Sequence, residues 1–347
     1  MTTLTVTAAA ARPRTHGRRR PVGLLAALAV LGVVVLASLA FGARDIAPAD
    51  VLGALVDPVP GNPDHDVVLD QRVPRTVVGL VVGAALGLAG TIMQGITRNP
   101  LADPGLLGVN AGASLFVVLA ITLLDLTSPG AYVWFALAGA ALAAAVVYGV
   151  GSIGREGATP VKLALAGTAL TAWSTSVITL VLLSDSDTLN SYRRWSVGSL
   201  AGRTTDMLLP LAPFLLVGLV LALATGRTLN LLAMGDDVAR GLGQDVRLAR
   251  VLAASAIVLL AGAATAVAGP IVFVGLVVPH LVRPFTGPDY RWILPYSVVL
   301  GPVVLVAADV IGRLVVQPGE LEAGLVVAVV GGPALVAIVR HVKLAGL

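Results

Sequence analysis

The sequence predicts an all-α polytopic membrane protein with about ten transmembrane helices. Hydrophobic residues make up 57% of the 347 residues and charged residues only 12%, with a mean hydropathy of +0.93. Globular domains average about a quarter charged residues. The apolar residues lie in runs of roughly 20, the length that crosses a bilayer as a helix. The connections between these runs are too short to form a separate soluble domain.

The N-terminus predicts a basic cytoplasmic tail over residues 1–20, followed by a single transmembrane domain over residues 21–347. The tail contains Arg12, Arg14, Arg18, Arg19 and Arg20. An apolar run follows over about residues 21–41. It is longer than the core of a signal peptide, which is about 7–15 residues. We therefore interpret it as a retained first helix.

Nine further apolar runs follow and alternate across the membrane. Their approximate bounds are 73–95, 105–124, 131–151, 160–183, 207–225, 248–268, 271–286, 293–311 and 322–339. With the N-terminus inside, 16 of the 23 Lys and Arg residues fall in cytoplasmic segments, as the positive-inside rule expects. The sequence therefore predicts a multi-pass protein of the cell (inner or cytoplasmic) membrane with both termini in the cytoplasm.

A polar break separates the second and third apolar runs, within the stretch 94–113. It contains Arg98, Asn99, Pro100, Asp103 and Pro104. The two prolines lack backbone donors and push the preceding residues out of helical geometry. The glycines that follow, Gly105, Gly108 and Gly112, give the next helix a small-residue face. On the residues alone, this stretch is as well explained by a plain polar turn between two helices as by a segment with a specific role.

The connection at about 229–245 interleaves apolar and charged residues. It is too polar to span the membrane and too apolar for a free linker. Two short amphipathic helices hinged near Gly235 fit it. On the residues alone, such helices lie on the membrane surface or press against a cytoplasmic partner.

No catalytic motif is visible in the sequence. The chain has no cysteine, and its four histidines (His16, His65, His280 and His341) show no metal-ligand spacing. It contains no Gly-Lys dipeptide, so it has no P-loop for a nucleotide phosphate. The net charge of +4 needs no nucleic-acid partner. We therefore expect neither an enzyme nor a resident metal or cofactor.

Charged residues near the predicted outer surface allow two interpretations. Asp309 lies within a span, and Arg313 follows it at i+4, on the same helix face. A local ion pair is the simpler explanation, and a proton relay would need further partners. Arg72, Arg75 and Arg313 are either anchors whose side chains reach the interface or docking groups for carboxylates of another protein. The residues alone do not decide between these.

Several ordered motifs together resemble the FecCD/BtuCD-type permease family. These proteins are the membrane subunits of ABC importers for iron–siderophores, haem and cobalamin. The resemblance covers about residues 22–340. It rests on Arg72-x-Pro-Arg75, on residues 94–104 with Leu107-Gly108, on Trp195-Ser196-x-Gly198-Ser199-Leu200, on Gly235-Asp236-Asp237-x-Ala239 with Leu242-Gly243, on residues 269–276 with Pro279, His280 and Arg283, and on Asp309, Arg313, Glu320-Leu321 and Gly331-x-Pro333.

The resemblance implies partners. They are a second copy of the chain or a homologous permease, two cytoplasmic ATPase subunits that bind ATP and Mg, an extracytoplasmic substrate-binding protein, and the lipid bilayer. It also implies roles for particular residues. Coupling to the ATPase is expected at Gly235, Asp236, Asp237, Ala239, Leu242 and Gly243, and docking of the binding protein at Arg72, Arg75 and Arg313. The pathway and its gate are expected at Thr159, Thr168, Thr171, Ser174, Thr175 and the segment after Glu320. The motif scaffold comprises Gln94, Arg98, Asn99, Pro100, Asp103, Pro104, Gly269, Pro270, Pro279 and His280.

The expected function is therefore the permease subunit of an importer for a metal chelate, with an iron(III)–siderophore as the leading cargo. Haem and cobalamin are alternatives within the family. A stand-alone secondary transporter and a purely structural membrane anchor are alternatives from other classes. Two departures from the family pattern, Glu322-Ala323 and Ala334-Leu335, alter the two ends of the tenth predicted helix.

Overall fold

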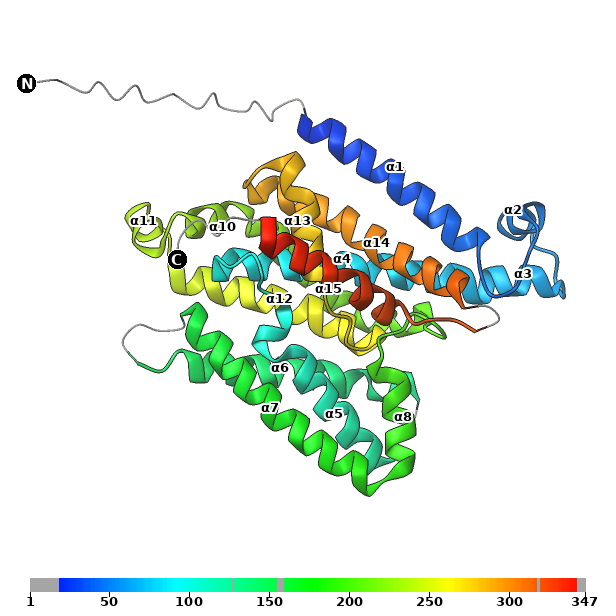
Figure 1. The fold of residues 1–347 in the computed structure, drawn as a ribbon, viewed down its shortest axis with the longest axis horizontal. Coiled ribbons are helices and arrows are strands. Elements are labelled where there is room, and N and C mark those ends of the chain that lie inside the picture. The colour runs from blue at the N-terminus through cyan, green and yellow to red at the C-terminus, as the bar shows by residue number, and fades with distance from the viewer. Residues whose placement is uncertain (1–18, 127, 155–158, 317–318, 342–347) are drawn as a thin grey trace, which may run out of the picture.

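A computed structural model describes residues 19–341 except 127, 155–158 and 317–318 (Figure 1). All regular secondary structure in these ranges is helical, which confirms the predicted all-α class. Seven helices in the described part are long and apolar enough to cross a membrane, and the apolar helices Val109–Leu124 and Ala323–Ala337 are shorter. Most of the predicted N-terminal tail, residues 1–18, lies outside the described residues.

The helices begin and end close to the predicted bounds. In chain order they are α1 (Arg19–Ala40), α2 (Pro48–Val56), α3 (Pro63–Val67), α4 (Val73–Thr97), α5 (Val109–Leu124), α6 (Pro129–Gly151), α7 (Pro160–Ser184), α8 (Ser186–Ser196), α9 (Ala212–Ala224), α10 (Gly226–Ala233), α11 (Asp236–Gly241), α12 (Val246–Ala268), α13 (Val274–Thr286), α14 (Tyr290–Val315) and α15 (Ala323–His341). Each of the ten predicted runs coincides with one of these helices. Length and composition alone, however, qualify seven of them as spans.

Helix α4 forms the centre of the bundle, and small residues let its neighbours approach closely. A Cβ atom on Gly83 would lie 2.7 Å from the backbone of Pro302 in α14. A Cβ atom on Gly90 would lie 2.0 Å from the carbonyl oxygen of Gly275 in α13. Gly87 likewise faces the backbone of α14. Close backbone packing replaces the hydrophobic driving force that membrane helices lack, as the Gly83-x-x-x-Gly87 spacing predicts.

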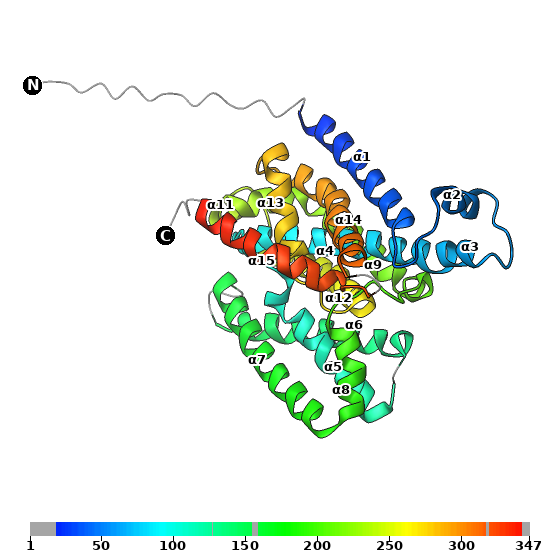
Figure 2. The same ribbon diagram turned by 45° about the vertical axis from the view of Figure 1, so that its right-hand side comes forward.

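The bundle has two sides and two ends. Figures 1 and 2 place α5–α8 on one side of α12, and α1, α13 and α14 on the other. Helices α2 and α3 lie at one end of the bundle, and α10 and α11 at the opposite end. Helix α4 connects these ends, because Arg72 and Arg75 are at its start and Arg98 is at its finish. Two polar clusters lie at these ends.

Candidate functional site

The first cluster brings two of the three predicted docking arginines, Arg75 and Arg313, onto one buried carboxylate, and the third, Arg72, lies beside them. Asp309 of α14 accepts hydrogen bonds from Arg75 Nη2 at 2.8 Å and from Arg313 Nε at 3.0 Å. Arg75 Nη1 also donates to Glu320 Oε2 at 2.7 Å. The ion pair predicted between Asp309 and Arg313 is therefore confirmed. Its second cation, Arg75, comes from α4 and was not predicted from the spacing.

Arg72 and Arg313 both bind the C-terminal end of α1. Arg72 Nη1 donates to the carbonyls of Leu39 and Ala40 at 2.8 and 2.7 Å. Arg313 Nη1 donates to the carbonyls of Ser38 and Phe41 at 2.9 and 3.0 Å. The last carbonyls of a helix lack intrahelical partners and carry a partial negative charge, so cations stabilise this end. Arg72 and Arg313 are only 4% and 1% exposed, which is incompatible with side chains that reach out to the membrane interface.

A cavity of about 230 Å³ opens beside this cluster. Its charged lining consists of Arg44, Arg72, Arg75, Arg313 and Glu320. The Asp309 side chain is 1% exposed and holds two guanidinium groups, whereas the Glu320 side chain is 28% exposed and holds one. The structure thus brings the predicted docking residues together at one pocket, and Glu320 is its accessible carboxylate.

A π-helical turn over Val68–Arg72 precedes the cluster. It joins α3 and α4 into one helical stretch over residues 63–97, and its extra residue per turn rotates Arg72 relative to a regular helix. Nothing in the local sequence predicts such a turn. Residue chemistry alone therefore could not give the direction in which Arg72 points.

The second cluster, at the opposite end of α4, holds α11 in place. Asp236 pairs with Arg98, which follows α4, and with Arg250 of α12 at 2.9 Å. Gly235 precedes α11 with a φ of 111°, a conformation that favours glycine. The predicted pair of short helices hinged near Gly235 is therefore present as α10 and α11.

The residues predicted for coupling divide into inward-facing and outward-facing groups. Ala239 is fully buried and Asp236 is tied by its ion pairs, so these two hold the segment together. Leu242 is 61% exposed, and Val238 and Met234 are 44% and 62% exposed. Met234 ends α10 on the other side of the Gly235 hinge, and Val238 and Leu242, four residues apart, form an exposed apolar stripe along α11. This spacing was readable in the sequence, but Met234 and Val238 were not selected.

The predicted motif scaffold between α4 and α5 makes local contacts and contacts between helices. Gln94 Nε2 donates to the carbonyl of Leu276 at 3.3 Å, and Gln94 Oε1 accepts from Arg283 Nη2 at 2.8 Å, which ties α4 to α13. Asn99 Oδ1 accepts from the amide of Leu101 at 2.9 Å. Asp103 caps the short helical turn Pro104–Leu107 through the amide of Gly105 at 2.8 Å, and burial raises the pKa of the Asp103 carboxyl.

Gly269 and Pro270 lie where three distant segments meet. A Cβ atom on Gly269 would lie 2.2 Å from the carbonyl oxygen of Trp195, and the carbonyl oxygen of Pro270 packs against Gly198. The amide of Gly324, at the start of α15, donates to the Gly198 carbonyl at 2.9 Å. The motif around Trp195 therefore anchors α12 to α15.

Pro279 and His280 lie inside α13. A proline in a helix leaves the carbonyl four residues earlier without its usual partner, and here that carbonyl belongs to Gly275, which faces Gly90 of α4. The Nδ1 of His280 bonds the Leu276 carbonyl at 2.8 Å. Among the described residues, no group of three or more Asp, Glu or His side chains is placed to hold a metal ion.

The predicted pathway residues lie on or beside α7. Thr168, Thr171 and Thr175 are exposed at intervals of three and four and share one face. Thr159 caps the start of α7 by accepting from the amide of Lys162 at 3.4 Å. Ser174, by contrast, is 1% exposed and is buried within its own chain.

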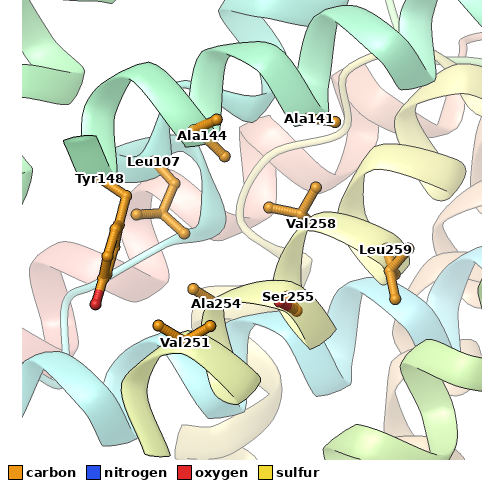
Figure 3. Close-up of a pocket in the computed structure, with 10 residues that line it drawn as sticks. Leu107, Ala141, Ala144, Tyr148, Val251, Ala254, Ser255, Val258 and Leu259 are labelled. Carbon is orange, nitrogen blue, oxygen red and sulfur yellow. The ribbon is translucent and has the colours of Figure 1, made fainter. Parts of the chain in front are cut away.

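Two cavities near these helices differ in character. One of about 420 Å³ is lined by Thr168 of α7 together with Thr97 and Asn99 of the scaffold segment. The other, of about 410 Å³, lies between α6 and α12 and is almost entirely apolar (Figure 3). None of the residues predicted for coupling, docking or the pathway lines the second cavity.

The chain matches the model of the FecCD transport family over residues 30–341. This protein belongs to the FecCD transport family. It is 42% identical to the ferric enterobactin transport system permease protein FepD of Escherichia coli, over 92% of this chain and 97% of that one. It is also 42% identical to the Fe(3+)-citrate import system permease protein YfmD of Bacillus subtilis, over 87% and 90% of the two chains.

A solved structure shares the architecture. The match is to an inward-facing conformation of a metal-chelate type ABC transporter, with a TM-score of 0.81 and 25% identity. It covers 93% of this chain and all of the other. The all-helical class and the family predicted from the motifs are therefore confirmed.

Proposed function

We propose that this chain is the membrane permease of an ABC importer that brings an iron(III) chelate into the cytoplasm. The observation that carries the proposal is the family match over residues 30–341, which includes both polar clusters. Relatives named for ferric enterobactin and Fe(3+)-citrate transport support an iron(III)–siderophore or a similar chelate as the cargo. Haem and cobalamin are the alternative cargoes within the family.

In this proposal the chain crosses the inner membrane ten times with both termini in the cytoplasm. Helices α5, α13 and α15 complete the seven longer spans, and the arginine cluster then faces outward and α11 faces inward. The chain pairs with a second copy or a homologous permease. The exposed faces of α7 and α15 support this arrangement, because Trp173 is 58% and Val329 73% exposed and need a covering partner or lipid.

The α11 end would couple to two cytoplasmic ATPase subunits, which bind ATP and Mg. The exposed stripe of Val238 and Leu242 on α11 supports a helix-in-groove contact, in which apolar side chains on one helix face fill a cleft, and Met234 is a further exposed apolar side chain at the end of α10. Asp236 and Ala239 would transmit movement from this contact, because Arg98 and Arg250 link Asp236 to α4 and α12.

The arginine pocket would receive carboxylates of the extracytoplasmic substrate-binding protein. Four guanidinium groups line it, and bidentate pairs with carboxylates are strong and directional. Arg72 and Arg313 are buried and bonded to the chain's own carbonyls, so Arg75 and Arg44 are the groups that a carboxylate would reach. The incoming group would replace Glu320 at Arg75, since Glu320 is the exposed and singly bonded acid of the cluster. Asp309 would remain in place.

Reconstituted transport tests the proposal. The chain is placed in proteoliposomes with its partner ATPase and binding protein, and uptake of radioactive iron as the ferric chelate is measured. We expect uptake only with ATP and all components. The Val238→Asp variant should lose both uptake and binding of the ATPase. Arg227→Gln is the control, because Arg227 is exposed on the preceding helix α10. Uptake without any ATPase subunit would contradict the proposal and favour a secondary transporter.

A further inference from the structure

The groove between α6 and α12 is the most apolar of the larger cavities, and the proposed transport cycle does not use it. Small side chains form its walls, with Ala141, Ala144 and Ala145 from α6 and Ala254 from α12 (Figure 3). Hydroxyl groups on Tyr148 and Ser255 are the polar side-chain atoms of the lining. Such a groove fits a slender acyl chain better than bulky protein side chains.

The surroundings of the groove face the bilayer. Helices α6 and α12 are both long and apolar enough to cross a membrane. Leu142 and Val146 of α6 are 53% and 43% exposed, and Leu252 of α12 is 39% exposed. An exposed apolar surface on a spanning helix contacts acyl chains, so the groove opens to lipid.

A cation marks one end of the groove. Arg247 lies four residues before Val251, so it falls on the same face of α12 as Val251 and Ser255, which line the groove. Arg247 is exposed and forms no ion pair or hydrogen bond with the residues that the structure describes. The apolar groove thus ends near a positive charge that no described residue of the chain neutralises.

A second, smaller cavity extends the groove toward the same end. It shares Leu107, Tyr148 and Ala254 with the first cavity and reaches Arg250. Tyrosine, with an apolar ring and a polar tip, is enriched where membrane helices meet water. The end of the groove near Arg247 therefore has the chemistry of the interface between acyl chains and headgroups.

The distance from Arg247 to the far end of the groove is close to the thickness of one leaflet. Twelve residues separate Arg247 from Leu259, the last α12 residue in the lining, which corresponds to about 18 Å of helix. Half of the hydrocarbon core of a bilayer is about 15 Å thick. One lipid can therefore place its phosphate at Arg247 and one acyl chain along the whole groove.

We propose that this groove is a binding site for one anionic phospholipid, with the phosphate on Arg247 and an acyl chain between α6 and α12. Arginine binds phosphate oxygens through two N–H groups, and negative headgroups concentrate near basic side chains at a membrane surface. A second copy of the chain would fill the apolar walls but would bring no phosphate to Arg247. One lipid supplies both an acyl chain for the apolar walls and a negative charge for Arg247.

Native mass spectrometry of the purified chain tests the site. The protein is equilibrated with equal amounts of palmitoyl-oleoyl-phosphatidylglycerol and the matching phosphatidylcholine, and retained lipid is counted. We expect about fivefold preference for phosphatidylglycerol, lost in Arg247→Gln. Arg227→Gln, which removes another exposed arginine at the same end, should keep the preference. Ala145→Phe should reduce retention of both lipids, because it fills the groove from an exposed position.

Three results would overturn the proposal. They are equal retention of the two lipids by the unmodified chain, equal losses in Arg247→Gln and Arg227→Gln, and unchanged retention in Ala145→Phe. The measurement needs no ATPase, binding protein or cargo. A wrong transport proposal would therefore leave its outcome unchanged.

Discussion

Replacement of Asp309 by asparagine should destabilise the arginine end of the bundle more than any nearby surface change. Asparagine keeps the size of the side chain and removes the charge that holds Arg75 and Arg313. Asp309 and Arg313 are each 1% exposed, so solvent cannot replace the lost carboxylate. Breaking a buried ion pair by removing one partner costs about 3–5 kcal/mol.

We expect Asp309→Asn to lower the free energy of unfolding by about 3 kcal/mol, near the lower limit of this range. The amide oxygen of asparagine still accepts one N–H bond, and Glu320 continues to hold Arg75 at 2.7 Å. One kcal/mol lowers the unfolding midpoint by about 2–4 °C in chains of 150–250 residues. This longer chain falls toward the smaller shift, so the midpoint should drop by about 6 °C.

Thermal unfolding of the purified protein in detergent, followed by tryptophan fluorescence, measures this shift. Asp206→Asn is the matched control, because Asp206 is exposed and its replacement should change stability by about 0.5 kcal/mol or less. The double variant Asp309→Asn/Arg313→Gln should cost about 1–3 kcal/mol less than the two single costs added. Equal midpoints for Asp309→Asn and Asp206→Asn, or strict additivity in the double variant, would refute the reasoning.

Three further predictions concern other parts of the bundle. Gly90→Ala places a Cβ atom 2.0 Å from a carbonyl oxygen of α13 and should sharply reduce the monodisperse fraction in size-exclusion chromatography, whereas Gly32→Ala, with open space around it, should not. Asp236→Asn should speed amide hydrogen exchange across α11, because it weakens the pairs that hold this helix, while exposed Asp237→Asn should leave exchange close to normal. Asp289 should stabilise the fold only above acidic pH. Its hydrogen bonds, chiefly with Arg291, lower the carboxyl pKa from 3.8 to about 2. The stabilisation of about 1–2 kcal/mol is therefore complete above the unfolded pKa and disappears as pH falls toward 2. Asp289→Asn should flatten the pH dependence of the unfolding midpoint over that range, and an unchanged acid limb would contradict the assignment.

Several features of the fold were predictable because they depend on local sequence. Apolar runs of about 20 residues specify helices in a membrane, since the backbone must satisfy its own hydrogen bonds there. Glycine and proline mark the ends of α4 and α12, and the helix bounds follow them closely. The pair of Asp309 and Arg313 was readable for the same reason, because both residues lie on one turn of one helix.

The candidate sites depended on contacts between residues that are distant in the sequence. Arg75 meets Asp309 across 234 residues, and Arg98 meets Asp236 across 138. No local pattern encodes these pairs, because they depend on how glycine faces set the approach of α4 to its neighbours. Burial has the same origin, which is why Ser174 and Ala239 face inward despite their motif positions.

The sequence by itself determined the helical membrane class, the order of the helices and the transport family. These follow directly from the composition, the lengths of the apolar runs and the order of the motifs. The tertiary structure alone decided that the three arginines predicted for docking share one pocket, that Asp236 ties α11 to α4 and α12, and that an apolar groove lies between α6 and α12. The physical reason is that packing at the α4 glycines fixes the helices relative to one another, and only then do charges from distant segments meet.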